Sequence, residues 1–94
     1  MALIYLELKI DLPYSQSLKD KRGIIKSITS RVSKRFNVSI SEIAQNDVWK
    51  SSLLGMAIVA NNGKLFDSVI ENIISFIELN YPEISVSIKM RENF

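Results

Sequence analysis

The chain has 94 residues, with twelve lysines and arginines against ten acidic residues, and it contains neither cysteine nor histidine. A chain of this length forms one domain, so we expect a single domain over residues 1–94. Without cysteine there is no disulfide framework and no thiolate nucleophile or metal ligand, and without histidine there is no imidazole base or ligand. The composition therefore favours binding over catalysis, and we expect no enzymatic activity, no metal and no cofactor.

No apolar segment is long enough to cross a membrane. The longest, Leu53–Ala60, falls well short of the roughly 18 residues of a spanning helix and fits a buried strand better. The first residues, Met1–Glu7, lack a basic leader and reach an acidic side chain early, unlike a secretory signal. These features predict a soluble cytoplasmic protein with no membrane partner.

The first third of the chain predicts a strand and then a helix. Apolar side chains occupy every second position of residues 3–12, which is typical of a half-buried strand, and Pro13 ends it. Ser17 is a good helix cap, and Asp20 stands at the position of a capping box. The apolar stripe that follows predicts a helix to about Phe36.

The rest of the chain repeats this pattern in the order strand, strand, helix, strand. Residues 37–45 predict a second strand with a bulge after Ile40, and the almost wholly apolar residues 50–61 predict a central third strand. Residues 64–80 carry apolar side chains at helical spacing. A last strand over residues 84–91 is expected to bury Ile84, Val86, Ile88 and Met90.

Two strand–helix–strand units on one sheet predict a fold of the α+β class. The order βαββαβ is that of the ferredoxin-like split βαβ sandwich, with a four-stranded antiparallel sheet. Each predicted helix has one apolar stripe, so both helices must cover the same face of the sheet. The opposite face of the sheet is expected to be open.

The charge is concentrated on the first predicted helix. Residues 19–35 hold seven basic residues against Asp20 alone, a net charge of +6, whereas residues 64–79 have a net charge of −2. A basic stripe beside hydroxyl side chains suits a phosphate backbone, and the alternative is a solvated helix whose long stems cover the edge of the core. The predicted nucleic-acid-binding residues are Lys19, Lys21, Arg22, Lys26, Lys34 and Arg35.

The open face of the sheet is the second candidate surface. RNA-recognition domains of this topology stack bases on aromatic residues of the first and third strands, but here the third strand has none. An apolar open face more often indicates self-association, so we expect a homodimer or higher oligomer. Lys89 and Arg91 are expected on the same face. The candidate interface residues are Tyr5, Trp49, Leu53, Ala57 and Val59.

Trp49 and the carboxylates have simpler interpretations. Trp49 is expected to cover the end of the sheet as part of the core, with an interface anchor as the alternative. The pairs Glu7/Asp11 and Glu42/Asp47 lack the spacing of a metal site, so we interpret them as surface charges.

Four segments, at residues 17–22, 35–43, 47–50 and 54–61, together resemble the YlxP-like family, a bacterial domain of unknown function. The resemblance implies a ferredoxin-like fold. It also implies a role near RNA or the ribosome, because genes of this family often lie among those for translation and ribosome maturation. The family often has histidine where this chain has Asn46, which argues against an essential histidine there.

Three hypotheses follow. The first is a non-catalytic RNA-binding or ribosome-associated accessory factor that uses its basic first helix. The second is a protein-interaction or assembly module that self-associates through the open face. The third is a small-molecule regulatory domain or a minimal enzyme, which ranks last because residues 13–22 lack the glycine-rich anion loop that the acylphosphatases of this topology need.

Overall fold

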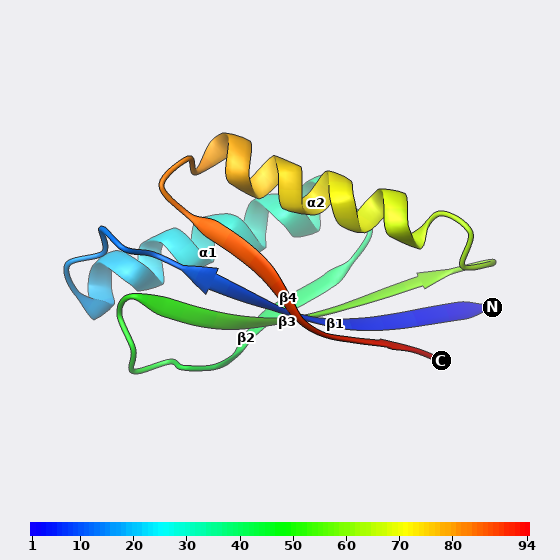
Figure 1. Cartoon of the computed structure of the whole chain (residues 1–94), viewed down its shortest axis with the longest axis horizontal. Coiled ribbons are helices and arrows are strands. Elements are labelled where there is room, and N and C mark those ends of the chain that lie inside the picture. The colour runs from blue at the N-terminus through cyan, green and yellow to red at the C-terminus, as the bar shows by residue number, and fades with distance from the viewer.

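The computed structural model describes all 94 residues, and its elements follow the predicted order (Figure 1). They are β1 (Ala2–Asp11), α1 (Leu18–Arg35), β2 (Ser39–Ala44), β3 (Ser51–Ala60), α2 (Phe66–Asn80) and β4 (Ser85–Asn93). No bound differs from the prediction by more than two residues, and β2 is one place where the difference reaches two. The Val38 N–H donates to the Phe36 carbonyl in a turn, so β2 begins two residues later than predicted.

The four strands form one antiparallel sheet in the order β2-β3-β1-β4. Both helices lie on the same side of this sheet, as Figure 1 shows, and the other side is uncovered. Ile4, Leu6, Leu8 and Ile10 of β1 have no exposed surface, because they point from the middle of the sheet into the helix layer. The prediction of a ferredoxin-like α+β fold is confirmed.

Helix α1 begins as its sequence predicts. The Ser17 hydroxyl accepts a hydrogen bond from the Asp20 N–H at 3.0 Å, and the Asp20 carboxylate accepts one from the Gln16 N–H at 3.2 Å. The Asp20 N–H, which the helix itself leaves unpaired, is thereby satisfied, a contact worth about 1 kcal/mol, and the bond from Gln16 ties the preceding residue to the first turn. This cap fixes where the basic face of α1 starts.

The prediction for the last strand is only partly right. Leu8 pairs with Ile88 but Glu7 pairs with Met90, so one extra residue, Lys89, forms a bulge in β4. Because neighbouring residues of a strand point to opposite faces, the bulge moves Met90 to the open face and Arg91 to the helix face. Arg91 there pairs with Asp67 of α2 at 2.6 Å, which corrects its predicted place on the open face.

The bulge in β2 also lies later than predicted. The pairing with β3 shifts between Glu42 and Ala44 rather than after Ile40, and this leaves Ile43 against the open face above Gly55. A Cβ at Gly55 would lie 2.9 Å from the Ile43 side chain, so the central strand needs glycine there.

Neither α1 nor α2 has the length and the apolar character that a membrane-spanning helix requires.

Candidate nucleic-acid-binding surface on helix α1

Three of the predicted phosphate-binding residues form one exposed row on α1, which we call the basic flank: Lys19, Arg22 and Lys26. They are three, four and seven residues apart, so they share one side of the helix. The ion pairs of the chain are Lys9–Asp11, Lys21–Glu42 and Arg91–Asp67, and none involves the basic flank. These three cations are therefore free to meet an anionic partner.

Lys34 and Arg35 extend the positive charge to the carboxyl end of α1, where the helix dipole favours cations. Both side chains are exposed. The Arg35 guanidinium lies 5.2 Å from the centre of the Phe76 ring of α2. Arg35 thus contributes to packing between the helices, whereas Lys34 has no ion-pair partner.

Lys21 does not belong to this surface, and its assignment to it is wrong. Its side chain has no exposed area and its ammonium lies 2.8 Å from the Glu42 carboxylate. The ammonium also donates to the Gln45 carbonyl, and the Ser52 hydroxyl donates to the same carboxylate oxygen of Glu42 at 2.5 Å. Glu42 is therefore a partner in a largely buried ion pair rather than the surface charge that we expected.

The sequence does contain the signal that places Lys21 inside. Ile25, Ile28 and Val32, four, seven and eleven residues further on, are all buried. At about 100° per residue these spacings return to the same side of a helix, so Lys21 lies in line with the apolar stripe. A lysine at such a position needs an acidic partner, because burial of an unpaired charge is costly.

Arg31, which is not among the predicted nucleic-acid-binding residues, joins α1 to α2. Its guanidinium lies 5.3 Å from the centre of the Phe76 ring and 5.4 Å from that of Tyr81. It donates to the Asn80 side-chain oxygen at 2.9 Å and to the Tyr81 hydroxyl at 3.2 Å. The opposite flank of α1 is thus used for internal contacts, and the basic flank is not.

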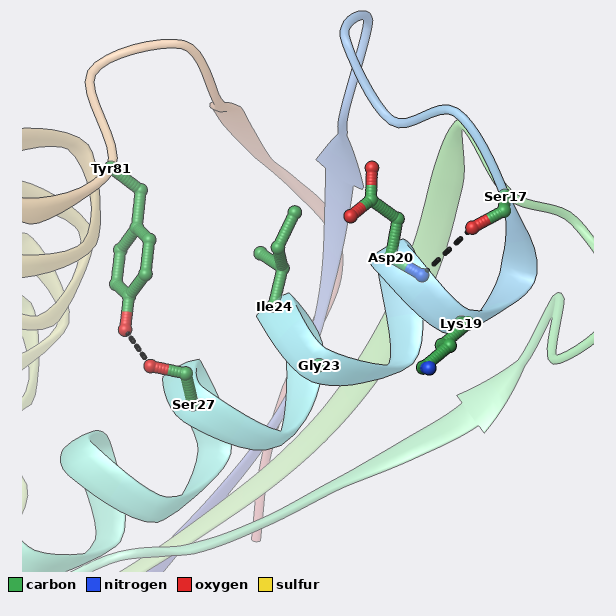
Figure 2. A pocket seen from close by; sticks show the side chains of 7 residues that line it. All are labelled: Ser17, Lys19, Asp20, Gly23, Ile24, Ser27 and Tyr81. Atoms are coloured by element: carbon green, nitrogen blue, oxygen red, sulfur yellow. Dashed lines mark hydrogen bonds between the residues drawn. The ribbon is translucent and has the colours of Figure 1, made fainter.

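A shallow groove of about 470 Å³ lies beside the basic flank. Figure 2 shows Tyr81 reaching from the end of α2 to the Ser27 hydroxyl, with Ile24 between Tyr81 and Asp20. The hydroxyls of Ser27 and Tyr81 lie 2.5 Å apart. Gly23 also lines this groove, and nothing lies within 4 Å of the place where its side chain would be. The backbone of α1 is therefore open to approach at this point.

Four of the predicted interface residues, Tyr5, Leu53, Ala57 and Val59, lie on the open face of the sheet as predicted, whereas Trp49 lies outside the strands. Trp49 lies in the β2–β3 connection with 46% of its area exposed, so the expectation that it is core is wrong. Leu53 pairs with Lys9 and has only 8% of its area exposed, so it offers little surface. Val59, at 57%, is well exposed, and Ala57 is half-buried opposite Tyr5. The bulges add Ile43 and Met90 to the open face.

Tyr5 is held in the middle of the open face. Its hydroxyl donates to the Glu7 carboxylate at 2.9 Å and lies 3.1 Å from where a Cβ of Gly55 would be. Desolvation, the hydrogen bond to Glu7 and the charge of Glu7 together raise the pKa of Tyr5 above 10.0. The aromatic ring is therefore engaged within the sheet, which weakens the case for base stacking there.

The fold and this surface define a ferredoxin-like α+β domain with a basic first helix. The chain belongs to the family described as "Protein of unknown function (DUF503)", whose model matches residues 3–90. A relative in Bacillus subtilis (strain 168), "Uncharacterized protein YlxP", is 38% identical over 78 residues, which cover 83% of this chain and 84% of that protein. The resemblance to the YlxP-like family is thereby confirmed.

Two designed proteins share the fold. The de novo designed protein Foldit4 has a TM-score of 0.61 with 15% identity, over 96% of both chains. The solution NMR structure of the de novo designed protein LFR1 1 with ferredoxin fold has a TM-score of 0.60 with 19% identity, over 96% of this chain and 87% of that one. At these identities the likeness concerns the fold alone.

Proposed function

We propose that this protein is a non-catalytic RNA-binding factor of the cytoplasm, of the kind that acts on or beside the ribosome, and that it binds RNA through α1. The observation that carries this proposal is the row of unpaired cations Lys19, Arg22 and Lys26 on an exposed helix face. Lys34 adds an exposed cation near the carboxyl end of α1, and Asp20 is the one acidic side chain of α1.

The charge distribution supports this surface over the others. Excluding Lys21, whose charge is paired with Glu42, α1 presents six cations to solvent against Asp20. Helix α2 has no basic residue and carries Asp67, Glu71 and Glu78. An anionic polymer is thus attracted to one helix and repelled by the other, which orients it on the protein.

The test is the salt dependence of binding. Fluorescence anisotropy of a labelled ribosomal RNA hairpin is titrated with the protein at about 50 and 200 mM salt, because phosphate contacts weaken steeply over this range. Log affinity falls as log salt rises, and replacing the basic flank in the K19Q/R22Q/K26Q variant should make this fall less steep by about 2–3 units of slope. An unchanged slope in a variant with wild-type circular dichroism would contradict the proposal.

Self-association through the open face is the second candidate, and one observation favours it. Ile43, Val59 and Met90 lie on that face with 44%, 57% and 37% of their areas exposed. A second copy of the chain would bury these apolar side chains. Light scattering tests this directly. A dimer that V59E dissociates would support self-association, and a monomer at high concentration would exclude it.

A further inference from the structure

Gly23 lies in the middle of the basic face of α1 without a structural reason to be glycine. It is exposed, it has an ordinary helical backbone with no positive φ, and apart from the adjacent backbone of α1 itself nothing lies within 4 Å of the Cβ that another residue would add. Glycine is among the poorest helix formers because it loses the most backbone freedom. Neither conformation nor packing within the chain explains glycine here.

The neighbours of Gly23 indicate what approaches it. Lys19 is four residues before it and Lys26 three residues after it, so the two cations flank the bare backbone on one side of the helix. A partner drawn to these two cations passes directly over Gly23. Asp20, on the groove side, has its carboxylate bonded to the Gln16 N–H and repels phosphate, which directs an anionic partner towards the lysines.

The same face favours a double helix over a single strand. Proteins that bind single strands stack bases on exposed aromatic rings. The aromatic ring that lines the groove beside this face, Tyr81, is instead held by the Ser27 hydroxyl and lies 5.4 Å from the Arg31 guanidinium. Double-helical RNA is recognised through its shape, its phosphates and its 2′-hydroxyls, which needs a straight row of cations and close approach rather than stacking.

We propose that α1 docks on the backbone of double-helical RNA and that Gly23 is the point of closest contact. The proposal rests on the RNA-binding function above and specifies its partner. From Lys19 to Lys26 the basic flank extends for about 10 Å along α1, at 1.5 Å per residue. Lys19 and Lys26 hold phosphates on either side of the crossing point, and a side chain at position 23 would push the backbone away from both.

The test combines stability with affinity in the full chain. Gly23→Ala should raise the melting temperature by about 4–8 °C, because alanine is the better helix former and meets no atom. Its affinity for an RNA hairpin should fall by about threefold, and that of Gly23→Gln by about tenfold. The slope against salt should stay unchanged, because neither variant removes a charge.

Ser75→Ala is the matched control, since Ser75 is exposed in the interior of α2. It should stabilise the protein without changing affinity. Unchanged affinity in both Gly23 variants, together with lost binding in K19E/R22E/K26E, would overturn the role of Gly23 and leave the RNA-binding function standing. Tighter binding to a single strand of the same composition would overturn the choice of partner. No binding of wild type to either RNA at about 50 mM salt would overturn both proposals.

Discussion

The ammonium of Lys21 lies 2.8 Å from the carboxylate of Glu42, and 0% and 16% of the two side chains are exposed. The pair joins the first turns of α1 to the end of β2. The Lys21 ammonium also donates to the carbonyl of Gln45, a residue with a φ of 63°. A non-glycine residue in this left-handed region is held there by its surroundings. The pair thus fixes the β2–β3 connection against the helix that carries the basic flank.

Removing either partner of this pair should destabilise the protein strongly. Lys21→Met leaves the Glu42 carboxylate with the Ser52 hydroxyl as its remaining partner, and we expect a loss of about 3–5 kcal/mol in the free energy of unfolding. Urea unfolding followed by circular dichroism measures it.

The double variant K21M/E42Q is the control for this prediction. It removes both charges and keeps an amide oxygen that accepts from Ser52, so it should recover a large part of the loss. The loss in the double variant is compared with the sum of the losses in Lys21→Met and Glu42→Gln. A loss equal to that sum would show that the pair does not act as a unit.

Arg31 should matter for stability and not for RNA binding. Arg31→Ala removes two ring contacts and two hydrogen bonds to α2, and we expect a loss of about 1–2 kcal/mol in the free energy of unfolding. Arg31→Lys keeps the charge but lacks the planar fork, so it should lose most of the same amount. The affinity of Arg31→Lys for RNA should equal that of wild type. A drop as large as that of the basic-flank variants would place Arg31 in the binding surface.

The Tyr5 hydroxyl should lose its proton only above the ordinary pH range for tyrosine. Its pKa is raised above 10.0, because its hydroxyl is desolvated and bonded to Glu7. The folded state therefore holds this proton more tightly than the unfolded state does. The stability that Tyr5 contributes is present below pH 10 and is lost as the pH rises through its folded pKa.

Absorbance at the phenolate band, compared between wild type and Tyr5→Phe, isolates this titration. In Glu7→Gln the Tyr5 pKa should lie closer to its ordinary value but still above it, since desolvation of the hydroxyl remains. A Tyr5 titration at or below the ordinary value in wild type would contradict the structure of the open face.

The sequence predicted the elements whose signals are local. The alternation in β1, the Ser17–Asp20 cap of α1 and the helical spacing of α2 each lie within one segment, and these elements were placed to within a few residues. The bulge at Lys89 was missed because it exists only in the register with β1. Residues 84–91 alternate in the same way with or without this bulge, so the predicted sheet faces of Met90 and Arg91 were wrong.

The candidate site was also predicted only in part, because some of its residues are placed by contacts with other elements. Lys19, Arg22 and Lys26 are exposed, as the helical pattern requires. Lys21 lies in line with the buried stripe of α1, and the Glu42 carboxylate that neutralises its charge belongs to another element, so its charge alone does not predict its place. The open space above Gly23 depends on how α2 and its following loop pack, which no local pattern contains.

The most direct test of the account separates the location of charge from its amount. K19E/R22E/K26E and K50E/K64E/K89E each change the net charge of the chain from +2 to −4 through exposed lysines and arginines that form no ion pair. We predict that the first variant loses RNA hairpin binding at about 50 mM salt, whereas the second keeps it to within a few-fold. Equal loss in both variants, or binding retained in the first, would contradict the claim that α1 is the RNA-binding surface.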